Sequence, residues 1–458
     1  MPHTPDLTVV PQGVKDVCAA LRARGKRAWI VGGCVRDLLL GQTPADWDVC
    51  TDAQPGEILR TFRRAIPTGI DHGTVTVVHG GHHYEVTTLR GETTYTDGRR
   101  PDAVYFTEDL DHDLARRDFT VNAIALDPVS GDVIDPFGGR DDLAAKMLRA
   151  VGDPHARFQE DGLRVLRAAR FTSTLEFELH PATREAIGPT LETFRKVSAE
   201  RVRDEWLKTM KARRPSRAFD VMRETGILAI TCPELLLGVG MAQNKWHAHD
   251  VWRHAMECMD ACAGDPILRI AALFHDVGKP ATRAFSDKTS DWTFYDHERV
   301  GAELVDPICD RMRFSNDERG RITHLVRHHL FHYQPDWSDA AVRRWIQRVG
   351  KERILDLYAL NEADVRAKGR DCSEDLANLR ALREHVTRVL ERGAAQSTRD
   401  LAIGGHDLMK ELGLGPGRLL GEILRELFEE VTENPDLNTR DALLEKARVI
   451  VEKKAEQP

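Results

Sequence analysis

The hydrophobic pattern of the chain changes its period near residue 150. Before that point, short apolar runs rich in β-branched residues alternate with polar residues, a period of two that predicts strands. These runs are residues 28–33, 46–51, 73–80 and 83–90, and residues 12–25 and 54–65 of the same part have the 3.6-residue period of helices. From about Asp153 the pattern is helical to the end. The sequence therefore predicts an α/β N-terminal domain followed by an all-α remainder.

The length of 458 residues leaves room for about two to four domains, and the hydrophobic content of 41% is enough for sizeable cores. Breaks rich in Pro and Gly near residues 231–246 and 283–296 interrupt the helical part. We expect a head domain at 1–150, a helical neck at 151–240, a third domain at 241–374 and a helical tail at 375–458.

Composition excludes several classes of protein. No apolar run approaches the ~20 residues of a membrane span, and the first residues, MPHTPDLTVVPQ, lack the basic start and apolar stretch of a signal peptide. The eight cysteines are scattered without the paired spacing of a zinc site, which favours free thiols in a reducing compartment. We therefore expect a cytoplasmic protein.

The net charge of −8 is unevenly distributed along the chain. Residues 140–217 contain 17 Lys and Arg against 12 Asp and Glu, a basic stretch within an acidic protein. Such a stretch suits the backbone of a nucleic acid. Solvated helix faces with the same charges are the alternative interpretation.

Two aspartates in a predicted strand are the first candidates for chemistry. Because side chains alternate along a strand, Asp46 and Asp48 should point to one face and Trp47 to the other. Two carboxylates so placed suit Mg²⁺, which prefers oxygen ligands and serves phosphoryl or nucleotidyl transfer. We expect a third carboxylate on a neighbouring strand. Glu85 is the candidate, with an ordinary edge-strand acid as the alternative.

A pair of glycines upstream adds a pattern for phosphate binding. Gly32 and Gly33 follow an apolar strand and precede a helix, where glycine lets a triphosphate approach the backbone at the helix N-terminus. Arg36, on the first turn, can reach the same phosphates. A lone Asp-x-Asp is most often a turn or surface feature, but its combination with these residues is much more specific.

Residues 32–49 resemble the first motif of the nucleotidyltransferases of the polymerase-β superfamily. More narrowly, they resemble the bacterial class II group, which contains tRNA CCA-adding enzymes and poly(A) polymerases. Four further motifs of this group follow in order: RRDFTVNAIA at 116–125, DPFGGRDDL at 135–143, EDGLRVLRAARF at 160–171 and ERVRDEWLK at 200–208. Each motif is weak alone, but five in order leave little room for coincidence. The resemblance implies a polymerase-β-like nucleotidyltransferase head domain.

The resemblance implies a role for each matching residue of the head. Asp46 and Asp48 would hold the catalytic Mg²⁺ ions. Gly33 and Arg36 would bind the triphosphate, and Arg117 would bind the ribose or a phosphate.

In this family, the Asp and Arg of the fourth motif pair with the Watson–Crick edge of the incoming CTP or ATP, so no nucleic-acid template is used. These residues are Asp161 and Arg164 here. At positions i and i+3 of a helix they would share one face, with an acceptor beside a forked donor. Arg167 and Arg170 continue that face and would reach phosphates. A salt-bridged helix surface is the alternative.

Details favour the CCA-adding branch. Poly(A) polymerases of this group usually carry a basic stretch after the Asp-x-Asp strand, whereas residues 66–78 read IPTGIDHGTVTVV. Relatives that add only CC lack a flexible basic loop between the first two motifs, and residues 94–106, TYTDGRRPDAVYF, look like that loop. We therefore expect full CCA addition rather than CC-only or A-only activity.

The helical part holds a second constellation. His254, the pair His275 and Asp276, and Asp364 arrive in the order of HD-type metal phosphohydrolases, a domain that some relatives also carry. Imidazole and carboxylate ligands suit a transition metal such as Mn²⁺, Ni²⁺ or Fe²⁺. Some CCA-adding enzymes with such a domain hydrolyse 2′,3′-cyclic phosphates or phosphate ends, whereas others keep the helices and lose the activity.

Several histidines compete for the same ligand positions in this second site. His247, His249 and His254 are alternatives for the first ligand. His297, with either His328 or His329, would complete a two-metal site.

The sequence thus predicts a template-independent CCA-adding tRNA nucleotidyltransferase that also has HD phosphohydrolase activity. Its partners would be tRNA, CTP and ATP, with no membrane and no obligate protein partner. One alternative is a poly(A) polymerase. The other is a metal-dependent HD phosphohydrolase whose N-terminal half only binds nucleotide or RNA.

Overall fold

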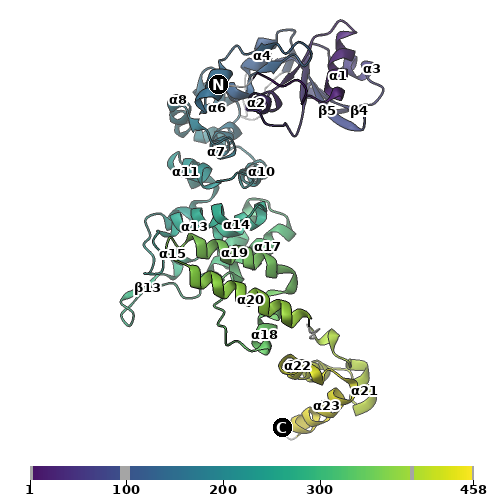
Figure 1. The fold of residues 1–458 in the computed structure, drawn as a ribbon, viewed down its shortest axis with the longest axis vertical. Helices are drawn as coiled ribbons and strands as arrows, with labels where there is room; N and C mark the ends of the chain where they lie inside the picture. Colours follow the sequence, from purple (N-terminus) through teal and green to yellow (C-terminus); the bar gives the residue numbers. More distant parts are fainter. Residues whose placement is uncertain (1–3, 93–103, 392–396, 456–458) are drawn as a thin grey trace. The chain divides into compact units, whose positions relative to one another are not determined.

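A computed structural model describes residues 4–92, 104–391 and 397–455 of the chain (Figure 1). The chain divides into two compact units, residues 1–237 with 308–315 and residues 238–307 with 316–458. Residues 94–103 of the predicted basic loop lie outside the described residues.

The first unit begins with a mixed sheet of seven strands in the order β3-β4-β5-β2-β1-β8-β9. These strands are β1 (Ala28–Val31), β2 (Asp48–Thr51), β3 (Ala65–Gly69), β4 (Thr74–His79), β5 (His82–Thr88), β8 (Ala125–Leu126) and β9 (Val133–Ile134). Strand β2 runs parallel to β5, and the other neighbours are antiparallel. A separate pair joins β6 (Arg90–Glu92) to β7 (Val104–Phe106).

Helices pack on this sheet through apolar faces. They are α1 (Gln12–Arg22), α2 (Gly33–Leu39), α3 (Pro55–Thr61), α4 (Leu110–Ala115) and α5 (Gly139–Ala145). In α1, for example, Val14, Val17, Cys18 and Leu21 recur at helical spacing and are buried. The strands and helices predicted for the head are present, but several bounds differ. The strand at 28–33 ends at Val31, the strand at 46–51 begins at Asp48, and the helix at 54–65 ends at Thr61.

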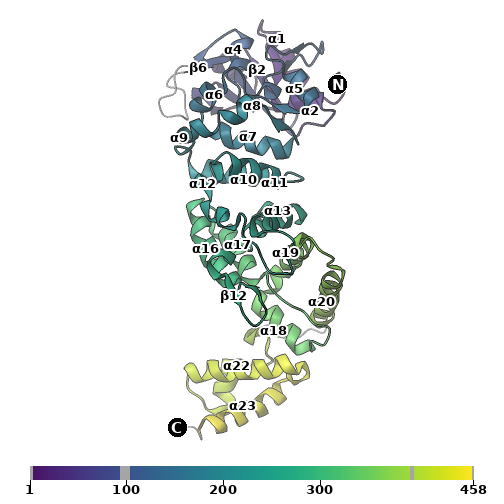
Figure 2. The ribbon, with the colours of Figure 1, turned by 90° about the vertical axis from the view of Figure 1, so that its left-hand side faces the viewer.

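The helical neck completes the first unit. Its helices are α6 (Pro154–Glu160), α7 (Leu163–Thr174), α8 (Pro181–Glu185), α9 (Leu191–Phe194), α10 (Ala199–Thr209), α11 (Ser216–Glu224) and α12 (Ile227–Thr231). Helix α7 lies against both α10 and α11 (Figure 2). Strands do not stop at residue 150 as predicted, because the short β10 (Met147–Leu148) pairs in parallel with β11 (Glu178–Leu179).

The second unit is almost entirely helical. It contains α13 (Val251–Ala261), α14 (Pro266–Phe274), α15 (Lys279–Thr282), α16 (His297–Arg311), α17 (Asn316–His328), α18 (Asp339–Val349), α19 (Ile354–Ala367) and α20 (Ser373–Glu391). Helices α13, α14, α17 and α19 pack together. The predicted break at 283–296 contains a hairpin of β12 (Ala284–Ser286) and β13 (Asp291–Thr293), a second departure from the all-α expectation.

The C-terminal residues form the helices α21 (Gly405–Leu412), α22 (Arg418–Glu433) and α23 (Arg440–Ala455). Their facing apolar side chains, among them Leu408, Ile423, Leu427 and Leu443, form a core of their own. In the part of the chain that the structure describes, no helix combines the length and the hydropathy of a membrane span. All eight cysteines are free and buried, as the sequence predicts.

Candidate active sites

The parallel pairing of β2 with β5 places two of the predicted carboxylates side by side. The register sets Asp48 directly opposite Glu85. Asp46 precedes the strand, at a bend that follows Pro44, so the strict alternation of a strand does not reach it. Asp46, Trp47, Asp48 and Glu85 all line one cleft of about 860 Å³. Trp47 therefore lines the same cleft as the aspartates. The strand pattern had predicted that Trp47 would point to the opposite face, and this prediction is wrong.

The electrostatics of this cleft fit a divalent cation. Partial burial of Asp48, together with the negative charges of Glu85 and Asp46, raises the pKa of Asp48, and only Arg117 opposes that shift. Three carboxylates that repel one another in a solvent-accessible cleft are a donor set for a hard cation with oxygen preference. The residue types therefore suit a divalent cation, although the three carboxylates do not bring one oxygen each within 4.8 Å of one another in this arrangement.

A glycine with a special backbone conformation brings an arginine to the same place. Gly32 precedes α2 with φ 82° and ψ −134°, a region that is accessible almost only to glycine. A Cβ added there would lie 2.8 Å from Arg117 Nη1. The guanidinium of Arg117 thus lies against the start of α2, and its Nε is buried without a hydrogen-bond partner among the described residues. Asp113, which is buried, holds Arg117 Nη2 at 3.3 Å.

We expect Gly32→Ala to impair nucleotide binding and to destabilise the fold. The new methyl group meets Arg117, and the backbone conformation costs about 1–3 kcal/mol for a residue other than glycine. The KM for CTP should rise, and the thermal midpoint should fall. A matched Gly25→Ala variant, also at positive φ but with open space around it, should lose stability without a change in KM.

Gly33 is the first residue of α2, and Arg36 follows one turn later. The Arg36 guanidinium donates to Asn122 Oδ1 at 2.8 Å and to Asp37 Oδ1 at 2.8 Å. Asn122 belongs to the second motif, so this contact joins the first two motifs. The sequence pattern had not singled out Asn122 or Asp113.

The prediction that Asp161 and Arg164 share the face of one helix is wrong. Asp161 has extended backbone dihedrals and lies in a break between α6 and α7, where its Oδ1 accepts a hydrogen bond from Leu163 N. Gly162 forms the break, since a Cβ there would lie 2.6 Å from the carbonyl oxygen of Thr193. Asp161 Oδ2 is paired with Arg201 at 2.8 Å.

Arg164 is anchored by three protein acceptors. Its Nη1 donates to Glu160 Oε2 at 2.5 Å and to the Arg157 carbonyl at 2.9 Å, and its Nη2 donates to the Arg116 carbonyl at 2.9 Å. Asp161 and Arg164 remain close in the chain and flank the same break. The Asp161 carboxylate accepts one contact on each oxygen and so keeps acceptor capacity for a base edge.

The two following arginines of α7 meet carboxylates of other motifs. Arg167 Nε donates to Asp118 Oδ2 at 2.8 Å, and Arg170 Nε is 3.1 Å from Glu205 Oε2. Burial alone would raise the pKa of Asp118, but Arg167 and the amide of Asn122 lower it to about 2. This ion pair therefore makes its full contribution to stability at pH values above the ordinary carboxyl pKa. The contribution is lost as the pH falls towards 2. The role of Arg167 and Arg170 as phosphate ligands stays a prediction.

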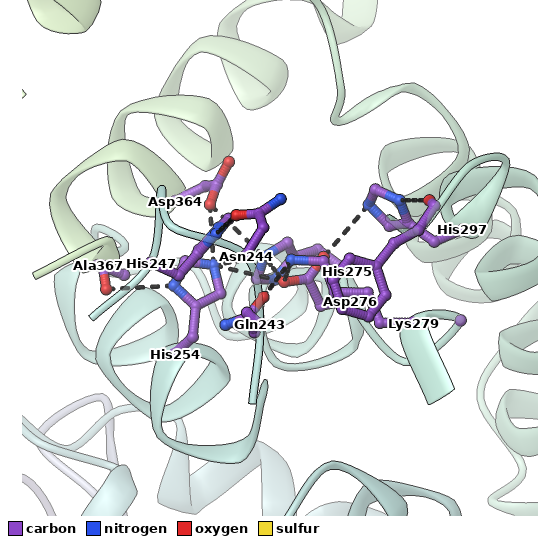
Figure 3. Close-up of polar contacts among 12 residues, drawn as sticks. Gln243, Asn244, His247, His254, His275, Asp276, Lys279, His297, Asp364 and Ala367 are labelled. Atoms are coloured by element: carbon purple, nitrogen blue, oxygen red, sulfur yellow. Dashed lines mark hydrogen bonds and ion pairs between the residues drawn. The ribbon is translucent and has the colours of Figure 1, made fainter. Parts of the chain in front are cut away.

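The second unit brings the four predicted HD residues into one buried cluster (Figure 3). His254 Nε2 lies 2.9 Å from Asp364 Oδ1 and 3.2 Å from His275 Nε2. His275 Nε2 in turn lies 3.2 Å from Asp276 Oδ2. Four nitrogen and oxygen donors from α13, the end of α14 and α19 therefore converge on a space of the size that one metal ion occupies.

Asp276 also belongs to a second set of donors. Its Oδ1 lies 3.3 Å from His297 Nε2 and 4.0 Å from His329 Nε2, and the two imidazole nitrogens are 3.3 Å apart. The open choice of the sequence is thus resolved in favour of His329. His328 instead lies against His324, with ring centroids 4.5 Å apart.

Backbone carbonyls fix the orientation of all four imidazoles. The Nδ1 atoms of His254, His275, His297 and His329 lie 2.7–3.1 Å from the carbonyl oxygens of Ala367, Ala272, Phe294 and Val326. An Nδ1–H that donates to a carbonyl leaves the Nε2 lone pair free towards the cluster, which is the usual arrangement of metal-binding histidines. The donor set therefore fits one or two transition-metal ions.

Two residues beside the cluster extend it. His247 Nδ1 bonds to Asn244 Oδ1 at 2.9 Å, and its ring meets the His254 ring at 5.0 Å, so His247 joins His254 and Asp364. Burial lowers the pKa of His247 to about 3, which keeps it neutral at pH 7. Lys279 Nζ lies 2.6 Å from Asp276 Oδ2. Sequence reasoning missed Lys279, although its i+3 spacing from Asp276 on HDVGKP was a usable signal.

Comparisons with known proteins follow the same division of the chain. The family model described as "Poly A polymerase head domain" matches residues 28–149, and "Probable RNA and SrmB- binding site of polymerase A" matches residues 176–237. The model "HD domain" matches residues 247–368.

Full-length relatives cover nearly the whole chain. A CCA-adding enzyme of Enterococcus faecalis is 34% identical over 451 residues, 96% of this chain and 97% of its own. That of Lactiplantibacillus plantarum is 31% identical over 458 residues, 98% of this chain and 99% of its own. The crystal structure of the Bacillus stearothermophilus CCA-adding enzyme in complex with CTP superimposes with a TM-score of 0.72 at 28% identity, over 96% of this chain and 98% of that chain.

Proposed function

Because the chain belongs to the family of CCA-adding enzymes, we propose that it adds C, C and A to the 3′ end of tRNA from CTP and ATP. The observation that carries this proposal is the carboxylate cleft, in which Asp48 stands in register with Glu85 and beside Asp46. The family is one of nucleotidyltransferases, so the chain is an enzyme of this class. The predicted fold, a polymerase head followed by a helical remainder with an HD domain, is confirmed.

The reaction is an in-line attack of the terminal 3′-OH on the α-phosphate of the nucleotide, with pyrophosphate as the leaving group. Asp46, Asp48 and Glu85, which line the cleft, would hold a divalent cation. That ion would neutralise charge on the phosphates and favour ionisation of the attacking hydroxyl. Arg117, held by Asp113 with its Nε unpaired, and Gly33 at the start of α2 receive the phosphates and ribose.

Nucleotide choice falls to Asp161 and Arg164. An acceptor and a forked donor can pair with the edge of cytosine or adenine and leave a wrong base with unpaired buried groups. The contacts of Asp161 with Arg201 and of Arg164 with Glu160 hold both side chains at one break before α7. If a base edge replaced Arg201 as the partner of Asp161, nucleotide binding would be coupled to α10, because α10 carries Arg201.

The choice of acceptor separates this function from poly(A) polymerase activity. We expect ATP alone to give no extension of an unstructured RNA, because the relatives that match the whole chain are CCA-adding enzymes. The test compares a tRNA that ends at its discriminator base with an unstructured RNA of equal length, each with ATP alone and with CTP and ATP together. A long A ladder on the unstructured RNA would contradict the proposal.

We also propose that the HD cluster is a metal-dependent phosphohydrolase site. Its support is the convergence of seven residues that offer ligand atoms to a metal: His247, His254, His275, Asp276, His297, His329 and Asp364. These residues would hold a metal that would act as a Lewis acid and lower the pKa of a water for attack on phosphorus. Lys279 adds a buried positive charge next to Asp276.

The test uses the full chain, stripped with a chelator and reloaded with Mn²⁺, Ni²⁺ or Fe²⁺. Hydrolysis of bis-p-nitrophenyl phosphate should be absent after stripping and restored by at least one of these ions. Failure of every ion to restore hydrolysis of this substrate and of a nucleoside 2′,3′-cyclic phosphate would contradict the proposal.

A further inference from the structure

Asn122 bridges a guanidinium and a carboxylate in the first unit. It is buried at the end of a short 3-10 helix, η2 (Thr120–Asn122). Its Oδ1 accepts a hydrogen bond from Arg36 Nη1 at 2.8 Å, and its Nδ2 donates to Asp118 Oδ1 at 3.1 Å. An arginine can only donate and an ionised carboxylate can only accept, so the side chain between them needs an acceptor at one end and a donor at the other. The amide of asparagine meets both requirements.

The Arg36 end of this bridge lies where the triphosphate is expected. A Cβ added to Gly33 would lie 3.6 Å from Arg36 Nη2, so the guanidinium lies beside the start of α2. Two of its five N–H groups donate hydrogen bonds within the described residues, one to Asn122 and one to Asp37, so donors remain for a phosphate. Asp37 belongs to α2 itself. Asn122 therefore supplies the hydrogen bond that fixes the guanidinium relative to the rest of the unit.

The Asp118 end of the bridge is attached to α7. Asp118 Oδ2 accepts hydrogen bonds from Arg167 Nε at 2.8 Å and from Arg167 Nη2 at 2.5 Å. Arg167 lies on α7, three residues after Arg164. A continuous row of contacts thus leads from Arg36 on α2 through Asn122 to the helix that carries Arg164.

The arginines at the two ends of this row lie close to each other. The guanidinium carbons of Arg36 and Arg167 lie 5.6 Å and 5.3 Å from the centre of the Phe171 ring. Two cations over one ring repel each other. An Arg36 that lost its hydrogen bond to Asn122 would therefore move away from Arg167 and from its place beside Gly33.

Resting on the proposed nucleotidyltransferase function, we propose that Asn122 is a positioning residue for the triphosphate, which holds the Arg36 guanidinium beside Gly33 and ties it to α7 through Asp118. Asn122 acts through Arg36, because its oxygen is already occupied by that arginine. Its loss should weaken the binding of a nucleoside triphosphate more than that of a monophosphate, which lacks the β- and γ-phosphates.

The experiment measures the Kd of CTP and of CMP for the full-length protein by equilibrium dialysis with Mg²⁺. Asn122→Ala should raise the Kd of CTP about 10-fold, the cost of a hydrogen bond to a charged group, and leave the Kd of CMP unchanged. The KM for CTP should rise likewise during addition to tRNA, with little change in kcat. In an Arg36→Ala background, Asn122→Ala should have no further effect on CTP binding, because its partner is absent.

Asn122→Asp keeps the shape of the side chain and serves as a second variant if Asn122→Ala does not fold. The new carboxylate pairs with Arg36 and draws it from the phosphates, so the Kd of CTP should again rise while the Kd of CMP stays the same.

Thr120→Val is the matched control from the same turn. Thr120 Oγ1 is buried and donates to Asp142 Oδ2 at 2.7 Å, which directs it to α5 rather than to Arg36. This variant should lower the thermal midpoint and leave both Kd values unchanged.

Three results would overturn the inference while CCA addition by the unaltered protein stands. They are equal weakening of CTP and CMP by the folded Asn122 variants, no weakening of either, and an effect on CTP that persists with Arg36→Ala. An unaltered protein that adds no nucleotide to tRNA would instead overturn the proposed function, and the inference with it.

Discussion

Replacement of Asp48 by Asn should abolish the incorporation of CTP into tRNA. Asp48 lies opposite Glu85 in the register of β2 and β5. The charges of Glu85, Asp46 and Arg117 all act on the Asp48 carboxylate. An amide of the same shape keeps the packing but removes the charge that holds a divalent cation. Loss of a residue one shell further from a metal typically costs about 10–100-fold, so we expect a fall of more than about 100-fold in rate.

Single-turnover extension of a tRNA that ends at its discriminator base, with labelled CTP, measures this effect. Asp111→Asn is the matched control, because Asp111 is an exposed acid of the first turn of α4 in the same unit. It should incorporate CTP at the rate of the unaltered protein. The HD hydrolysis of Asp48→Asn should also be unchanged. Incorporation by Asp48→Asn within a few-fold of the unaltered protein would contradict the assignment.

Replacement of Asp276 by Asn should remove phosphate hydrolysis and leave CTP incorporation intact. Asp276 is the one carboxylate shared by both donor sets, with Oδ2 facing His275 and Oδ1 facing His297. Burial alone would raise the pKa of Asp276, but His275 and Lys279 hold the pKa well below its ordinary value, so the group is an anion at neutral pH. We expect bound metal, measured by elemental analysis, to fall together with hydrolysis.

Two neighbouring histidines provide a sharper test of the same geometry. His329→Gln removes a donor of the second set, whereas His328→Gln changes a residue that lies against His324. The first variant should lose hydrolysis about 10-fold or more, since outer-shell changes alone cost at least that much. The second should keep it. Equal rates for the two variants, each with an unchanged thermal midpoint, would contradict the second set.

The position of the carboxylates could be predicted from the sequence because strands impose a simple rule. The β-branched runs around Asp48 and Glu85 mark two strands, and the register of those strands sets both carboxylates side by side on the lining of one cleft. Asp46 and Trp47 do not follow the alternation of a strand, because the chain bends after Pro44 and the strand begins only at residue 48.

The break before α7 was missed because residues 160–171 have a continuous helical period. The dipeptide Asp161-Gly162 was a usable local signal, since Asp-Gly marks turns. Gly162 also packs closely on Thr193 and Phe194, so a larger residue would clash there. The basic stretch at 140–217 was equally ambiguous. Many of its arginines are paired with carboxylates, as Arg167 is with Asp118.

In the second unit, residue types and their order predicted the HD cluster, but they did not choose among neighbouring histidines. His328 ends α17 and His329 follows it, so the orientation of each depends on where the helix stops. Among His247, His249 and His254, the structure does not select a single ligand. His247 and His254 both lie with Asp364, whereas His249 belongs to none of the metal-ligand groups of the described residues.

The order of nucleotide addition tests the central proposal most directly. Purified protein, Mg²⁺ and a tRNA that ends at its discriminator base are incubated with CTP alone, ATP alone or both, and the products are resolved at single-nucleotide length. We predict two additions with CTP alone and a third only when ATP is also present. A long ladder with ATP alone, or no extension with both nucleotides, would contradict the assignment of this chain as a CCA-adding nucleotidyltransferase.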